Sequence, residues 1–111
     1  MEKLYCTVGI DEYLTGVYAV SVDLCADGAI VEGETAQNAD ESEISGETFD
    51  FSRYAELDDD VEYTIVVTLY DENEAELFSS DPIPWSEDKD WEAIISFYLD
   101  EETNQIGYEI F

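Results

Sequence analysis

Residues 61–70 read VEYTIVVTLY, and they decide the fold class. Large apolar side chains recur there at every second position, as Tyr63, Ile65, Val67 and Leu69. A period of two is typical of a β-strand with one buried face, and valine, isoleucine, threonine and tyrosine all favour strands. This stretch therefore predicts the strongest strand of the chain.

Shorter segments on both sides show the same alternation. We expect further strands over residues 4–10, 18–24, 29–35, 48–52 and 75–79. The segment from Asp81 to Pro84 ends the last of them, because a proline nitrogen has no hydrogen to donate to a sheet. Residues 36–47 contain one large apolar side chain, Ile44, and are expected to form a mobile loop or an irregular edge.

The C-terminal segment is compatible with two structures. Apolar residues alternate over 91–99, and the acidic stretch 100–104 suits a hairpin loop that leads into a strand over 105–111. A helix over 87–99 is the alternative, because Ser86 would cap it and acidic residues would occupy its first turn. We favour the hairpin, because isoleucine, phenylalanine and tyrosine are strand formers.

Six to eight short strands with turn residues between them predict an all-β fold, an antiparallel β-sandwich. The length of 111 residues suits a single domain that spans residues 1–111. With 45% hydrophobic and 14% aromatic residues, the chain has enough apolar surface to build a core. We therefore expect a folded domain despite its charge.

That charge is extreme. Thirty Asp and Glu residues stand against three Lys and Arg residues, and there is no histidine, so the formal net charge is −27. Contact with the phosphates of a nucleic acid requires many basic side chains, and so does binding to an anionic membrane surface. We therefore expect neither nucleic acid nor a membrane as a partner.

The expected location is the cytosol. No basic segment leads into an apolar stretch as in a signal peptide, and no apolar run approaches the roughly 18 residues of a membrane span. In that compartment Cys6 and Cys25 are expected to be reduced thiols on structural strands. A disulfide is the alternative, because a hairpin turning near Gly16 would place the two cysteines opposite each other.

The residues before the strongest strand resemble a feature of a known family. Leu57 and Tyr63 are separated by DDDVE, the spacing of the corner before strand F in fibronectin type III and related immunoglobulin-like sandwiches. The resemblance covers roughly residues 48–83 and gives both residues a structural role. It implies that the Tyr63 hydroxyl bonds to upstream backbone and holds the crossover between the sheets. Asp59 departs from the pattern, since the family usually has proline there.

The residue types do not favour catalysis or metal binding. Without histidine, and with two cysteines on structural strands, the common pairs of nucleophile and base are missing, so we expect no enzyme and no cofactor. Residues 23–34 match several positions of an EF-hand calcium loop, but Cys25 is a poor calcium ligand and the flanks alternate as strands. A hairpin turn at Asp27-Gly28 is the better interpretation, and no metal site is expected.

The acidic residues are clustered. Single clusters are ordinarily solvated loops, but here basic residues are not interspersed among them as on most soluble surfaces. The candidates for binding a partner are Asp40, Glu41, Glu43, Glu56, Asp58, Asp59, Asp60, Glu62, Asp71, Glu72, Glu74, Glu76, Asp100, Glu101 and Glu102. The group at 56–62 and the group at 71–76 are the first candidates for contact. A further acidic group lies at 87–92.

In size and charge, the chain is similar to the acidic DNA-mimic proteins of phages and mobile elements. That resemblance implies a non-enzymatic inhibitor that occupies the basic DNA- or RNA-binding surface of a host nuclease, as anti-CRISPR and anti-restriction proteins do. The partner would be a CRISPR effector or a restriction nuclease. Aromatic side chains, if exposed, would add anchoring contacts, and the candidates are Tyr70, Trp85, Trp91 and Tyr108.

Two other functions fit the same sequence. One is an acidic immunoglobulin-like module that binds a protein without mimicking nucleic acid. The other is a cation-binding domain, which would be stabilised by millimolar calcium.

Overall fold

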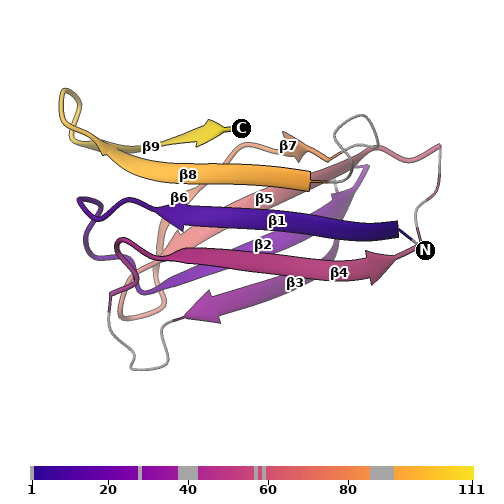
Figure 1. The fold of residues 1–111 in the computed structure, drawn as a ribbon, viewed down its shortest axis with the longest axis horizontal. Helices are drawn as coiled ribbons and strands as arrows, with labels where there is room; N and C mark the ends of the chain where they lie inside the picture. The colour runs from indigo at the N-terminus through magenta and orange to yellow at the C-terminus, as the bar shows by residue number, and fades with distance from the viewer. Residues whose placement is uncertain (1, 28, 38–42, 57, 59, 86–91) are drawn as a thin grey trace.

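The computed structural model describes residues 2–27, 29–37, 43–56, 58, 60–85 and 92–111. These residues form two β-sheets that pack face to face, and no helix occurs among them. In Figure 1, β1, β4, β8 and β9 form the layer nearer the reader, and the other strands lie behind it. The predicted β-sandwich is confirmed.

The first sheet has four strands in the order β4-β1-β8-β9. Their bounds are Glu2–Ile10 for β1, Thr48–Ala55 for β4, Glu92–Asp100 for β8 and Gln105–Ile110 for β9. β1 pairs antiparallel with β4 but parallel with β8. The sequence predicts antiparallel pairs only, so the parallel pair of β1 and β8 departs from that prediction. The two strands are far apart in the sequence and are not joined by a hairpin turn.

The second sheet has the order β3-β2-β5-β6, and the short β7 also pairs with β5. Its strands are Ala19–Ala26 (β2), Ala29–Gln37 (β3), Tyr63–Tyr70 (β5), Glu76–Ser79 (β6) and Ile83–Pro84 (β7). All of these pairs are antiparallel. The strand predicted over residues 61–70 is thus β5, and it lies at the centre of the sheet.

The core lies between the sheets and follows the predicted alternation. On β1, Leu4, Cys6, Val8 and Ile10 are all buried, and on β5 the same holds for Ile65, Val67 and Leu69. One edge of the sandwich is closed by three aromatic rings, with centroids 5.7–6.0 Å apart: Phe78, Phe97 and Tyr108.

β2 is buried more completely than a strand with one solvated face. Val20, Val22 and Leu24 point into the core as expected, but Ala19, Ser21 and Cys25 on the opposite face are buried too. β2 is an inner strand between β3 and β5, and its buried outward side chains are small. The Ser21 hydroxyl, for example, lies 3.2 Å from the hydroxyl of Tyr70.

The two cysteines do not pair. The chain after β1 crosses to the other sheet instead of turning back, so Cys6 lies in the first sheet and Cys25 in the second. Both thiols are free and buried. The arrangement that would place them opposite each other on neighbouring strands is therefore wrong, and the expected reduced thiols agree with the structure.

Of residues 36–47, which the sequence predicts to be a mobile loop or an irregular edge, 38–42 lie outside the described residues and the others are held to the sandwich. β3 continues to Gln37, and Ile44 is fully buried. The Ile44 N–H donates to the carbonyl of Val17 at 2.9 Å, which ties this segment to the β1–β2 crossover. A single isoleucine in a polar stretch therefore anchors the segment, because it completes the core at that end.

The C-terminal residues form the favoured hairpin. β8 and β9 pair antiparallel from Ile95 opposite Ile110 to Asp100 opposite Gln105. The helix alternative is wrong for residues 92–99, because as a strand they place Ala93, Ile95 and Phe97 in the core. The remainder of that alternative, residues 87–91, lies outside the described residues.

Candidate polyanionic surface

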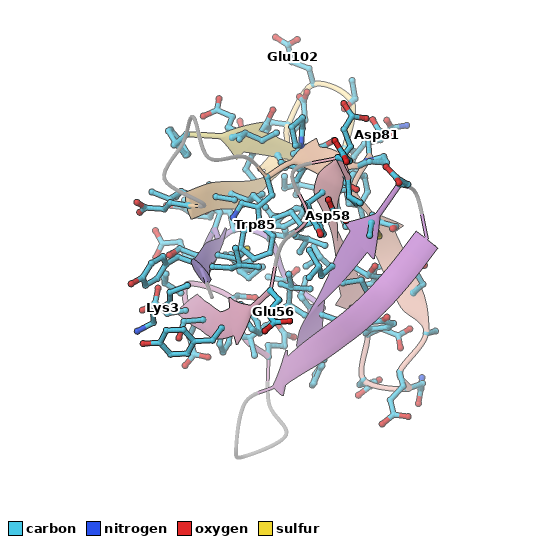
Figure 2. All side chains as sticks on the ribbon, turned by 90° about the vertical axis from the view of Figure 1, so that its right-hand side faces the viewer. Lys3, Glu56, Asp58, Asp81, Trp85 and Glu102 are labelled. Carbon is cyan, nitrogen blue, oxygen red and sulfur yellow. The ribbon has the colours of Figure 1, made fainter. Side chains whose placement is uncertain are left out.

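The carboxylates gather at the two ends of the sandwich. Five exposed ones lie where β2, β4 and β5 begin or end on one side, here called the corner end: Asp27, Glu56, Asp58, Asp60 and Glu62. Figure 2 looks onto this end and shows Glu56 and Asp58 within it. Ten more carboxylates form the tip end, of which Asp71 and Asp100 are half-buried and the rest exposed: Asp11, Glu12, Glu43, Glu47, Asp71, Glu72, Glu74, Asp100, Glu101 and Glu102.

The two first candidates for contact therefore lie at opposite ends. The group at 56–62 precedes Tyr63 and the group at 71–76 follows Tyr70, so the length of β5 separates them, roughly 24 Å at about 3.4 Å per residue. Glu76 opens β6 beside the tip end. Three predicted binding residues lie outside the described part of the chain: Asp40, Glu41 and Asp59.

Backbone hydrogen bonds hold the carboxylates of the corner end in place. The Asp58 carboxylate accepts the N–H of Asp60 at 3.0 Å. The N–H of Asp27 donates to the carbonyl of Glu62 at 2.9 Å, and the Glu62 N–H donates to the Asp27 carboxylate at 3.1 Å. These bonds restrain the carboxylates of Asp58 and Asp27.

Tyr63 joins the corner end to the sheet. The N–H of Asp58 donates to the Tyr63 hydroxyl at 2.9 Å, which is the kind of upstream backbone contact expected for this tyrosine. Leu57, the other residue expected to have a structural role here, lies outside the described residues. The hydrogen bond places the acidic turn directly at the start of β5.

The tip end is built from turns of the same kind. The Asp71 carboxylate accepts the N–H groups of Asn73 at 2.8 Å and Ala75 at 2.9 Å, and the Asp100 carboxylate accepts that of Glu102 at 2.9 Å. An aspartate that accepts the N–H two residues on is a common turn-forming device. In both turns the aspartate carboxylate forms the turn, and the adjacent glutamates stay exposed and carry surface charge.

Tyr18 lies between two acidic segments of the tip end, since the Val17 carbonyl accepts the Ile44 N–H and the Tyr18 N–H donates to the Tyr70 carbonyl. Partial desolvation raises the pKa of the Tyr18 hydroxyl, and the negative charges of Glu43 and Glu72 raise it further. The Glu43 carboxylate also accepts the N–H of Gly16 at 3.2 Å. Two acidic segments far apart in the sequence are therefore neighbours around this tyrosine.

Most of this charge has no basic side chain to neutralise it. With three Lys and Arg residues in the chain, at most three of the thirty carboxylates can each have a cation of their own. The Lys3 ammonium lies 5.3 Å from the ring centre of Tyr5 and 5.4 Å from that of Tyr54, at a distance typical of cation–π contacts. The surface charge is thus available to an external cation.

The aromatic anchors expected from the sequence are not the exposed ones. Trp85 is buried, at 4% exposure, Tyr70 and Tyr108 are half-buried, and Trp91 lies outside the described residues. Trp85 is buried because it follows β7 and completes the core. The aromatic residues that the structure exposes are Tyr5, Tyr13, Tyr54 and Phe111. Of these, Tyr5 could have been found, since it alternates with the buried residues of β1.

The predicted hairpin turn replaces the calcium loop. β2 and β3 pair up to Ala26 opposite Ala29, and Asp27, which follows β2 in a turn, has a φ of 49°. Gly28, the other residue of the predicted turn, lies outside the described residues. Positive φ at the Asp27 position is what the tight hairpin turns require. Within the described ranges, no group of three or more His, Cys, Asp or Glu side chains is placed to hold a metal ion.

The part of the chain that the structure describes contains no helix able to cross a membrane. Comparison of the sequence and the structure with protein-family models, curated proteins and solved structures finds no match.

Proposed function

We propose that this protein is a non-enzymatic inhibitor that mimics nucleic acid. It occupies the basic DNA- or RNA-binding surface of a defence nuclease in the host cytosol, either a CRISPR effector or a restriction enzyme. The observation that carries the proposal is the pair of carboxylate clusters held by backbone hydrogen bonds at the two ends of a sandwich.

The density of charge supports the proposal. Duplex DNA carries one charge per roughly 1.7 Å of its axis, so a charge of −27 equals that of about 46 Å of duplex. The protein measures 40 × 31 × 21 Å along its principal axes. Its net charge per unit of length is therefore slightly higher than that of the ligand it would replace.

Rigidity supports it as well. Binding costs free energy when side chains and loops become ordered, and a surface that is fixed beforehand avoids much of that cost. The turns at Asp58, Asp71 and Asp100 each have their aspartate carboxylate tied to the backbone. Such turns hold their negative charges in fixed positions, as the backbone of a nucleic acid does.

Inhibition of DNA cleavage tests the proposal. The purified protein is added to a panel of RNA-guided and restriction nucleases, and cleavage of a target duplex is measured at low salt. We expect stoichiometric inhibition of at least one nuclease. Charge reversal at one end, Glu56→Lys/Glu62→Lys or Glu72→Lys/Glu101→Lys, should weaken it about 10- to 100-fold, since each lost contact is worth about 1 kcal/mol.

The control variant changes one exposed side chain but no carboxylate. Ser52→Asn changes an exposed side chain in the middle of β4, away from both acidic ends, and leaves the net charge at −27, so it should inhibit as the natural protein does. Absence of inhibition across the panel, or inhibition that neither double charge reversal weakens, would contradict the proposal.

An interaction module without mimicry is the second candidate, and one observation favours it. Tyr5 and Tyr54, 43% and 64% exposed, flank Lys3 on the outer face of the first sheet. Exposed tyrosines are frequent anchors in protein interfaces. If Tyr5→Ser/Tyr54→Ser abolishes partner binding while both charge reversals leave it intact, this candidate replaces the first.

A further inference from the structure

A pocket opens at the corner end, on the outer face of the second sheet. Its volume is about 350 Å³, and its lining residues are Cys25, Asp27, Glu62, Thr64, Val66 and Pro82. Cys25 and Thr64 are opposite each other in the β2–β5 pair, and Val66 follows on the same face of β5. The pocket is therefore built on the central strands of the sheet, which are fixed on both sides.

The lining combines two kinds of surface. Val66, Pro82 and the buried Cys25 give apolar walls, whereas Asp27 and Glu62 are exposed carboxylates. The two acidic residues are neighbours, because the Asp27 N–H donates to the Glu62 carbonyl at 2.9 Å and the Glu62 N–H donates to the Asp27 carboxylate at 3.1 Å. An occupant of matching chemistry has an apolar stem and a positively charged head.

We propose that this pocket receives one arginine side chain of the basic partner. The proposal rests on the proposed function and adds a specific anchor to it. Arginine packs its methylene stem on apolar surface and binds carboxylates through a planar fork of N–H donors, which lysine lacks. The volume is at the lower end of the roughly 300–1,000 Å³ found for small-molecule pockets, as suits a single side chain.

Charge decides between possible occupants. A second copy of this chain carries the same −27 and three basic residues, so its approach to an acidic rim is opposed by repulsion. Asp27 and Glu62 repel an anionic ligand, and a neutral ligand forms no ion pair with them. A side chain from a DNA-binding surface, where arginine is abundant, meets both walls of the pocket.

A titration followed by NMR tests the assignment. N-acetyl-arginine amide is added to the ¹⁵N-labelled protein at constant ionic strength. The N-acetyl amides of lysine and of citrulline, the uncharged analogue of arginine, are added to separate samples. We expect weak, saturable shifts for arginine that centre on the amides of Cys25, Asp27, Glu62, Thr64 and Val66. Lysine should give at most a third of these shifts, and citrulline should give none.

Two sets of variants identify the pocket as the site. Asp27→Asn/Glu62→Gln removes two charges, and asparagine keeps both the tolerance for positive φ and the acceptor oxygen. It should weaken arginine binding at least five-fold, whereas Glu72→Gln/Glu101→Gln, which changes the charge equally at the tip end, should not. Val66→Tyr fills the pocket and should abolish the shifts, whereas Val66→Thr preserves its volume and should retain them.

Some results would overturn the assignment. These are arginine shifts spread evenly over all acidic turns, equal shifts for lysine, or full arginine binding in Val66→Tyr. The outcome is separate from that of the proposed function. If the protein inhibits cleavage but does not bind arginine in this pocket, the proposed function stands and the arginine pocket is wrong. If the protein binds arginine in this pocket but inhibits no nuclease, the arginine pocket stands and the proposed function is wrong.

Discussion

Tyr63 links the acidic corner to the core through one hydroxyl group. Its ring belongs to the partly buried layer around the core, and its oxygen accepts the Asp58 N–H at 2.9 Å. Removing the oxygen in Tyr63→Phe should lower the free energy of unfolding by about 0.5–1.5 kcal/mol, the net value of a typical hydrogen bond. Urea denaturation measures this, and Tyr13→Phe, at a tyrosine that is 72% exposed, is the control. Equal midpoints for the two variants would contradict the role of Tyr63.

Burial of Cys6 makes the stability depend on alkaline pH. Desolvation raises the pKa of its thiol from 9.0 to about 12. The folded state therefore keeps the proton while the unfolded state loses it, so this contribution is complete below pH 9 and is lost as the pH rises toward 12. Between pH 8 and pH 10 the loss should be about 1.4 kcal/mol, one pKa unit in free energy.

The comparison with Cys6→Ala isolates that thiol, because other alkaline groups such as Tyr18 remain in both proteins. Urea midpoints are measured for both at pH 8 and pH 10. The natural protein should lose more stability than the variant by roughly the stated amount. Parallel losses in the two proteins would show that Cys6 does not ionise on unfolding.

Among the elements, the β8–β9 hairpin contains a contact that the sequence pattern does not reveal. Gly107 lies opposite Tyr98, and a methyl group added at Gly107 would lie 2.8 Å from the ring atom Cζ of Tyr98. The ring covers the glycine, an arrangement known to compensate for the weak strand propensity of glycine.

Gly107→Ala should therefore destabilise the natural protein, because the ring must move away. In the background of Tyr98→Ala the same change should be neutral or stabilising, since alanine fits a strand better than glycine. A double-mutant cycle by thermal or urea unfolding should give a coupling of about 0.5–1 kcal/mol. Additive effects of the two changes would contradict the contact.

The strands were predictable where one face alone meets the core. β1 follows the alternation residue by residue, and on β5 Ile65, Val67 and Leu69 follow it as well, although the outward Thr68 is also buried. β2 was less predictable, because its outward residues Ala19, Ser21 and Cys25 are buried as well as its core-facing ones. The hairpin of β8 and β9 followed from propensity, but the parallel pairing of β8 with β1 did not, because it joins the two ends of the chain.

At the scale of the whole molecule, the acidic clusters were evident in the sequence but their grouping was not. The turns at Asp58 and Asp71 were both identifiable from their acidic composition. Their placement at opposite ends depends on the direction of β5 between them. Likewise, the neighbourhood of Glu43 and Glu72 around Tyr18 depends on the strand order. The pocket beside Asp27 depends on pairing between β2 and β5, and no local motif indicates it.

The salt dependence of binding tests the central claim most directly. For the nuclease that is inhibited most strongly, the dissociation constant is measured between about 0.05 and 0.5 M NaCl, with and without its duplex target. If fixed carboxylates replace phosphates, the constant should rise steeply with salt, and the duplex should compete for the same surface. A dissociation constant that stays level over this range, in a complex that still accepts the duplex, would contradict the account.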